Sequence, residues 1–244
     1  MLWTKVICGY LTPFDTINMC CTCKHLYAEI DEHMLKTNST KDFKLLKKNG
    51  EHIENEKYVM GIGQVLLFLN NCNMINIKKK IKNVEVILSS TILVENSMIV
   101  FEDCIFIPEN GYSLLDINKQ SNVLFSYCYV KDFVMFCKTY DSETNFENTI
   151  FENVSVPILG RRTYSNIFDS KFISCNMPIN YFENFRLVVR NTLFLKSVHS
   201  IIIHTDKQRN YLEIGDCNFS NCILPQISIS NENTIDIFCN KISI

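Results

Sequence analysis

Long apolar runs are missing from this sequence of 244 residues. A membrane-spanning helix needs about 18 consecutive apolar residues, and the sequence contains no such run although 47% of its residues are hydrophobic. An excess of positive charge is also missing, because 24 Lys and Arg residues are balanced by 26 Asp and Glu residues, for a formal net charge of −2. Non-specific nucleic-acid binding needs a basic surface. We therefore expect no membrane span and no nucleic-acid ligand, and we expect the partner to be a protein.

The first ten residues lack the apolar stretch of a secretory signal peptide. We therefore expect an intracellular protein, cytoplasmic or nuclear, whose 12 cysteines are reduced thiols. The sequons at Asn38, Asn153 and Asn218 then carry no glycan, because that modification requires secretion. The abundance of Asn, Ile and Lys indicates an AT-rich coding genome, of which a viral origin is one interpretation.

A complete metal-binding pattern is missing as well. Cys20, Cys21, Cys23 and His25 are clustered, but no second Cys or His pair follows at the spacing of a zinc finger. A helix would also point these side chains in different directions. We therefore expect these residues to pack inside a helical unit, and we predict no metal site and no cofactor.

What the sequence does contain is a six-residue phrase that recurs through its second half. Each copy reads apolar, variable, Asp or Asn, small, variable, aromatic, and the five clear copies are Phe101–Phe106, Phe146–Phe151, Ile167–Phe172, Val189–Phe194 and Ile214–Phe219. Two looser copies extend the series, one closing at Val130 or its neighbour Tyr129 and one closing at Ile242. The period is about 22 residues. Units of this size cannot bury their own apolar face and must stack on their neighbours.

The repeating units are predicted to be strands. Apolar residues recur with period two, as at Val123 and Phe125, which is the strand period and not the helix period. The L-x-x-L-x-L pattern of leucine-rich repeats is absent. A unit with two or three short strands and polar corners is typical of a right-handed parallel β-helix. We predict a mainly β domain of about eight coils over residues 64–244.

Two positions of the phrase form columns when the units are stacked. The first column is the third position of the phrase, where Asp and Asn alternate. These residues suggest either the carboxylates of a polysaccharide-cleaving β-helix or turns, and we favour turns because both residue types bond to nearby backbone. The second column is the fourth position of the phrase, where small residues recur, which fits a tight interior corner. There we expect free thiols, although stacking would permit a disulfide between neighbouring cysteines. The first column is Asp103, Asn148, Asp169, Asn191 and Asp216, and the second is Cys104, Cys128, Thr149, Ser170, Thr192 and Cys217.

Polar segments of variable length separate the phrases, and on a solenoid we expect them to project along one edge. These segments are residues 118–122, 138–145, 160–165, 205–210 and 230–234. They carry Arg and Tyr, the usual anchors of protein interfaces, so this edge is a candidate target-binding surface, and a merely solvated edge is an equally good interpretation. The candidate residues are Tyr140, Arg161, Arg162, Tyr164, Lys207 and Arg209.

Residues 1–36 follow a different pattern, that of a small helical unit. Thr12 is a good helix cap before Pro13, and Asp15 is placed to accept free backbone N–H groups. A further segment to about Leu35 places apolar residues four apart on one face. A polar, lysine-rich connector with some helix, residues 37–63, follows this unit.

The N-terminal segment resembles an F-box. The matching elements keep the order and spacing of that family, and they are Tyr10-Leu11, Asp15, Cys23-Lys24 and Tyr27. The sequence departs from the family at its opening, which lacks Leu-Pro, and at its closing pair, where Leu35 is followed by Lys36 and not by Trp.

This resemblance, followed by a β-helix, implies the substrate receptor of a Skp1–cullin–F-box ubiquitin ligase. The implied adaptor-binding residues are Ile7, Leu11, Pro13, Ile17 and Leu26. The resemblance also implies that the recruited ligase performs the chemistry, so we predict no enzyme activity and no catalytic residue in this chain. The alternative is a carbohydrate-binding or carbohydrate-active β-helix similar to pectate lyases, in which the N-terminal helices cap the open end of the solenoid.

Overall fold

The computed structural model describes residues 56–60, 65–69, 73–205, 210–222, 226–229 and 235–240. The predicted helical unit, residues 1–36, and the predicted helix of the connector lie outside the described residues, as do Lys207 and Arg209. The described ranges contain no helix that is long and apolar enough to cross a membrane.

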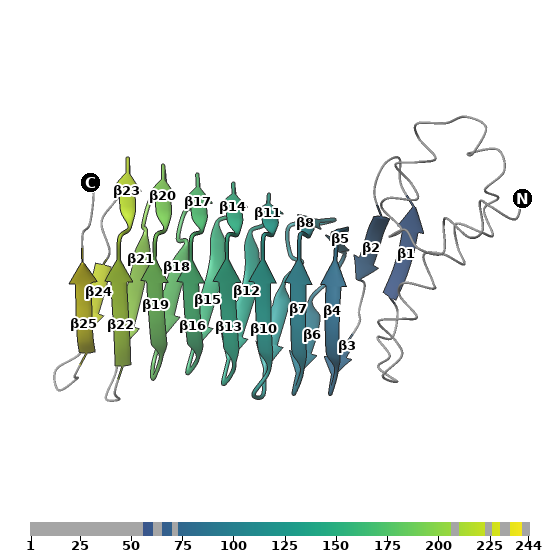
Figure 1. Cartoon of the computed structure of the whole chain (residues 1–244), viewed down its shortest axis with the longest axis horizontal. Coiled ribbons are helices and arrows are strands. Elements are labelled where there is room, and N and C mark those ends of the chain that lie inside the picture. Colours follow the sequence, from purple (N-terminus) through teal and green to yellow (C-terminus); the bar gives the residue numbers. More distant parts are fainter. Residues whose placement is uncertain are drawn as a thin grey trace, which may run out of the picture.

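The chain forms a parallel β-helix, as the period of about 22 residues predicted (Figure 1). Each turn gives one strand to each of three sheets, which we call A, B and C. In sheet A the strands follow the order β1 (Glu56–Met60), β2 (Val65–Leu69), β5 (Val84–Leu88), β8 (Ile105–Pro108), β11 (Tyr129–Lys131), β14 (Ile150–Glu152), β17 (Lys171–Ile173), β20 (Leu193–Leu195) and β23 (Asn218–Ser220).

Sheets B and C run beside sheet A along the same axis (Figure 1). Sheet B consists of β3 (Asn73–Ile75), β6 (Ile92–Glu95), β9 (Leu115–Asn118), β12 (Met135–Tyr140), β15 (Val156–Arg161), β18 (Ile179–Phe182), β21 (Ile201–Thr205) and β24 (Gln226–Ile229). Sheet C consists of β4 (Lys78–Lys82), β7 (Met98–Glu102), β10 (Asn122–Ser126), β13 (Glu143–Glu147), β16 (Tyr164–Phe168), β19 (Arg186–Arg190), β22 (Asn210–Gly215) and β25 (Ile235–Asn240).

The described solenoid has seven complete turns, from β3–β5 to β21–β23, where the sequence predicted about eight. The difference arises at the ends of the described stack. The segment near residue 64 contributes a single strand, β2, which pairs in parallel with β5. Strand β1 then pairs with β2 in the antiparallel direction and so does not begin another turn.

Rows of stacked phenylalanines fill the interior. In sheet C the Phe125 ring lies parallel to Phe101 and Phe146, at centroid distances of 5.2 and 5.0 Å. In sheet A a second row runs through the closing position of the phrase, with centroid distances of 4.8 to 5.1 Å between Phe151, Phe172, Phe194 and Phe219. These spacings match the strand separation because every strand is paired in register.

The pairing also shows that Val130, and not Tyr129, occupies the closing position of its turn, beside Phe106 and Phe151. The predicted closing residue Ile242 lies outside the described residues.

The Asp and Asn column forms the corner between sheets C and A. Its five members have left-handed backbone conformations, with φ between 49° and 52°. Asn and Asp tolerate this region better than most residues with a side chain. The corner N–H groups also continue the ladder between turns, since the Asp103 N–H donates to the Ser126 carbonyl and the Asn148 N–H to that of Phe168, both at 3.0 Å. The turn interpretation is therefore confirmed.

The small-residue column lies directly inside this corner, as predicted. All six members are buried, and each side chain donates a hydrogen bond to the carbonyl two residues earlier, as Ser170 does to Phe168 at 2.8 Å and Cys217 to Gly215 at 3.3 Å. Larger side chains would displace the neighbouring turns, because core packing leaves few voids. Cys104 and Cys128 are free thiols, as expected.

Two of the variable segments, residues 138–145 and 160–165, are largely strand and do not project as loops, contrary to the prediction. The six-residue strands β12 and β15 run up to the corner between sheets B and C, and only residues 141–142 and 162–163 separate them from the next strand. The corners are short because Asp141 and Arg162 adopt left-handed conformations, with φ of 48° and 51°. The segments do align along one edge of the solenoid.

Candidate functional site

The predicted target-binding residues that the structure describes lie at the corner between sheets B and C and on the strands beside it. Arg162 donates two hydrogen bonds to Asp141 of the preceding turn, at 2.9 and 2.7 Å. Arg161 forms a similar pair with Glu183 of the following turn, at 2.7 and 2.9 Å. The two arginines therefore connect three successive turns, which is a structural role in addition to any role in recognition.

Tyr140 and Tyr164 lie on opposite sides of this corner. The Tyr140 ring belongs to the outer face of sheet B and accepts cation–π contacts from Arg162, at 4.3 Å, and from Arg161, at 5.9 Å. Tyr164 starts β16 on sheet C and is 60% exposed. The structure thus brings Tyr140, Arg161 and Arg162 together and leaves Tyr164 apart from them.

A shallow depression of about 370 Å³ is present on sheet A, and a second one of about 350 Å³ on sheet B. The depression on sheet B is lined by Tyr140, Arg161, Lys138 and Phe182. Beside it the ring of His204 stacks on that of Phe182, with 5.0 Å between the ring centroids. Arginine and aromatic groups that lie together in this way are typical of protein interfaces.

The outer face of sheet A carries a feature that the sequence reading missed. From β5 to β20, seven of the twelve outward residues of sheet A are Ile or Leu and are only partly covered, whereas the other five are Glu85, Tyr129, Lys131, Glu152 and Lys171. We call the seven Ile and Leu residues the apolar strip, which consists of Ile87, Ile105, Ile107, Ile150, Ile173, Leu193 and Leu195. The signal was present in the sequence, because Ile105-Phe106-Ile107 and Leu193-Phe194-Leu195 are apolar on both faces of a strand.

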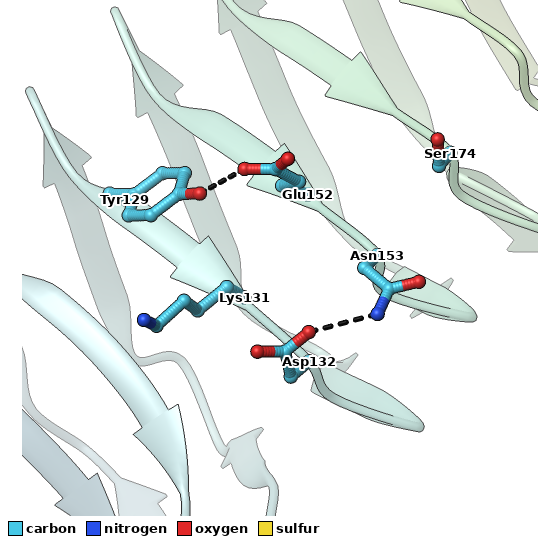
Figure 2. A pocket seen from close by; sticks show the side chains of 6 residues that line it. All are labelled: Tyr129, Lys131, Asp132, Glu152, Asn153 and Ser174. Atoms are coloured by element: carbon cyan, nitrogen blue, oxygen red, sulfur yellow. Dashed lines mark hydrogen bonds between the residues drawn. The ribbon is translucent and has the colours of Figure 1, made fainter.

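The depression on sheet A interrupts this strip with polar groups (Figure 2). The Tyr129 hydroxyl donates a hydrogen bond to the Glu152 carboxylate on the next strand, and Asn153 donates one to Asp132 at 2.9 Å. Lys131 points away from both pairs (Figure 2). The hydrogen bond to Glu152, together with burial, raises the pKa of Tyr129 to about 12. The hydroxyl therefore stays protonated at neutral pH.

The first column of the phrase adds charge to the edge of sheet A that faces sheet C. Asp103, Asp169 and Asp216 are exposed at this edge. Lys82 approaches Asp103 at 3.7 Å, whereas among the described residues Asp169 and Asp216 have no ion pair. The Arg190 guanidinium next to this corner is occupied by Glu213, at 2.6 Å.

The predicted adaptor-binding residues, Ile7, Leu11, Pro13, Ile17 and Leu26, lie outside the described residues. Comparison with protein-family models, with curated proteins and with solved structures finds no match to this chain.

Proposed function

We propose that the chain is a substrate-recognition subunit of an SCF-type ubiquitin ligase. Residues of the N-terminal segment bind a Skp1-like adaptor, which links the chain to a cullin, and the β-helix binds a target protein. The complex acts inside the cell, and the recruited ligase transfers ubiquitin. The chain itself raises the effective concentration of the target near the ubiquitin-charged enzyme.

The observation that carries this proposal is the order of two parts along the chain. A segment that resembles an F-box precedes a parallel β-helix with partly exposed apolar and Arg/Tyr-bearing faces. The resemblance concerns both parts, because some F-box proteins bind their targets through a right-handed β-helix. A solenoid suits this task since its outer faces are long and continuous.

A pull-down with a purified Skp1-like adaptor tests the proposal. We expect the wild-type chain to retain the adaptor, and we expect Leu11→Asp and Ile17→Asp to lose it, because a buried carboxylate at an apolar interface is costly. Asn18→Asp is the matched control, since it adds the same charge next to Ile17 at a polar position. A wild-type chain that does not retain the adaptor would remove the ligase proposal.

The depression on sheet A favours one alternative, a carbohydrate-binding β-helix. Its lining combines a tyrosine, carboxylates, an amide and a hydroxyl, which are groups that bind sugars, and it adds Lys131 for an acidic sugar. Titration calorimetry with acidic oligosaccharides separates the two functions. Heat of binding that disappears in Lys131→Ala, from a chain that does not retain the adaptor, would establish this alternative.

A further inference from the structure

None of the described residues that line the depression on sheet B is acidic. The volume of about 350 Å³ is at the lower end of the range for ligand sites, about 300 to 1,000 Å³, so the depression suits a short chain segment and not the surface of a folded domain. Its wall includes three apolar or aromatic side chains, two cations and one amide, which are Tyr140, Leu159, Phe182, Lys138, Arg161 and Asn118. A ligand that fits this wall carries an apolar group and a negative charge.

The two cations of this wall differ in their partners. The Arg161 guanidinium donates two hydrogen bonds to Glu183, at 2.7 and 2.9 Å, so its charge is already neutralised. Lys138 is exposed and forms no ion pair with any of the described residues. Its register partner on β9, Asp116, instead accepts a hydrogen bond from the Asn118 amide at 3.1 Å. Lys138 is therefore the cation that can pair with a carboxylate of a ligand.

The apolar part of the wall lies at a defined distance from Lys138. Leu159 is the register partner of Lys138 on β15, and Phe182 lies on the strand after that, beside Arg161. Leu159 and Phe182 are both outward and only partly covered. The position between these two strands is about one and a half strand spacings from Lys138, or about 7 Å at about 4.8 Å per spacing. Residues two apart in an extended peptide point to the same side and are also about 7 Å apart.

We propose that the depression on sheet B binds an extended segment of the target protein, in which an apolar residue and an acidic residue are two positions apart. The carboxylate pairs with Lys138, and the apolar side chain packs between Leu159 and Phe182. The segment runs along the axis of the solenoid, across β12, β15 and β18. The inference rests on the proposed function, because it states which chemistry of the target the receptor recognises.

Two outward residues of the depression can be changed with matched controls on sheet A. Lys138→Glu reverses the charge, and Lys171→Glu is its control, because Lys171 is likewise an exposed, outward lysine, on β17. Leu159→Asn removes the apolar contact, and Leu193→Asn is its control, because Leu193 is also outward and partly covered, on β20. Circular dichroism during urea denaturation verifies that each variant keeps the fold.

The probe is a nine-residue peptide labelled with an uncharged dye. It carries a central Leu, with Glu two residues before and two residues after it, so that both chain directions are represented. The other residues are Gly and Ser, and both termini are blocked, so that the Glu side chains supply the only carboxylates. Two further peptides carry Gln or Lys in place of both Glu residues.

Fluorescence anisotropy with the full chain should show that the Glu peptide binds more tightly than the Gln peptide. Lys138→Glu should weaken binding of the Glu peptide about fivefold to tenfold, because repulsion between like charges replaces a surface ion pair. The same variant should bind the Lys peptide more tightly than the wild-type chain does. Leu159→Asn should weaken binding of the Glu peptide, and the two controls on sheet A should leave it unchanged.

Any of three results would overturn the inference: no binding of the Glu peptide, equal binding of the Glu and Gln peptides, or equal losses with Lys138→Glu and Lys171→Glu. Tighter binding of a Gln peptide that ends in Leu with a free carboxylate would also overturn it, because the depression would then bind a chain end. The adaptor pull-down does not involve these residues. Adaptor binding without peptide binding would remove only this inference, whereas peptide binding without adaptor binding would remove only the ligase proposal.

Discussion

At the scale of single residues, the fold depends on which residue types can occupy the corners between the sheets. The sequence alone identified the Asp and Asn column and the small column inside it, because both recur at a fixed place in the phrase. It suggested that Asn and Asp hold the turn by bonding to their own backbone. The structure gives a different reason, namely the left-handed conformation that these residues adopt at φ near 50°. Side-chain hydrogen bonds at the corner come from the small column instead.

Asn148 tests this explanation of the corner. Asn148→Val should lower the free energy of unfolding by about 1 to 2 kcal/mol or more, because a β-branched residue is strained at a φ of 49°. Asn148→Asp should be nearly neutral, since Asp169 occupies the same position one turn later. Urea denaturation followed by circular dichroism measures both. Equal losses for the two variants would show that the conformation is not the cause.

At Gly160 the structure leaves no room for a side chain. A Cβ at this position would lie 2.7 Å from two ring atoms of Tyr181 and 2.8 Å from the Thr163 methyl. Gly160→Ala should therefore cost about 1 to 3 kcal/mol of stability, as overpacked cores do. Gly215→Ala is the control, because its Cβ would meet no atom closer than 3.6 Å. Thermal unfolding of the two variants would contradict this account if their melting temperatures fell by the same amount.

Tyr129 gives a pH dependence. Its pKa is raised to about 12 in the folded chain, chiefly by the hydrogen bond to Glu152, from an ordinary value of 10. The stabilisation from this pair is fully present below about pH 10 and is lost as the pH rises through 12. The absorbance difference between wild type and Tyr129→Phe should show a phenol that titrates near 12, and Glu152→Gln should move that transition toward 10. An unchanged transition in Glu152→Gln would exclude the carboxylate as the cause.

At the scale of the strand and the turn, stacking of identical positions stabilises the solenoid. Phe172 lies between the parallel rings of Phe151 and Phe194, at 4.8 and 5.1 Å, and is fully buried. Each turn therefore depends on both of its neighbours.

Phe172→Ala should cost about 3 to 5 kcal/mol, because it leaves a cavity between two turns. Phe172→Leu should cost less, since the row already contains the aliphatic Val130 beside Phe151. Phe168→Ala is a suitable control, because Phe168 points outward from sheet C and is only partly buried. Chemical denaturation gives the three values, and a similar cost for Phe172→Ala and Phe168→Ala would contradict the role of the row.

Strands also show where sequence reasoning reached its limit. The alternation of apolar and polar residues is clear in some strands of sheet C, such as β13, where Phe146 points inward between the outward Asn145 and Glu147. It fails in sheet A, because Ile105, Phe106 and Ile107 are apolar at every position and the pattern does not reveal which side faces solvent. The loops that the sequence predicted at residues 138–145 and 160–165 are largely strand, since Lys138-Thr139-Tyr140 and Gly160-Arg161 continue β12 and β15 to the corner. The polar outward residues of a strand are of the same types as the residues of a loop, so composition alone does not distinguish a strand from a loop here.

At the scale of the whole molecule, the chain enters the solenoid at β1 and runs along one axis to β25 (Figure 1). Residues 1–55 precede β1, and they include the segment that resembles an F-box. Adaptor and target would therefore be bound by different parts of the chain, so that variants on the outer faces of the β-helix and variants near Ile17 should affect different partners.

The central claim is that this chain links a target to a cullin through a Skp1-like adaptor. The most direct measurement is size-exclusion chromatography of the full chain mixed with the adaptor and the N-terminal domain of a cullin. We predict that the three proteins elute together at the mass of a complex with one copy of each, and that Ile17→Asp leaves the chain in a separate peak. Elution of the adaptor and cullin as a pair, with the wild-type chain apart from them, would contradict the account.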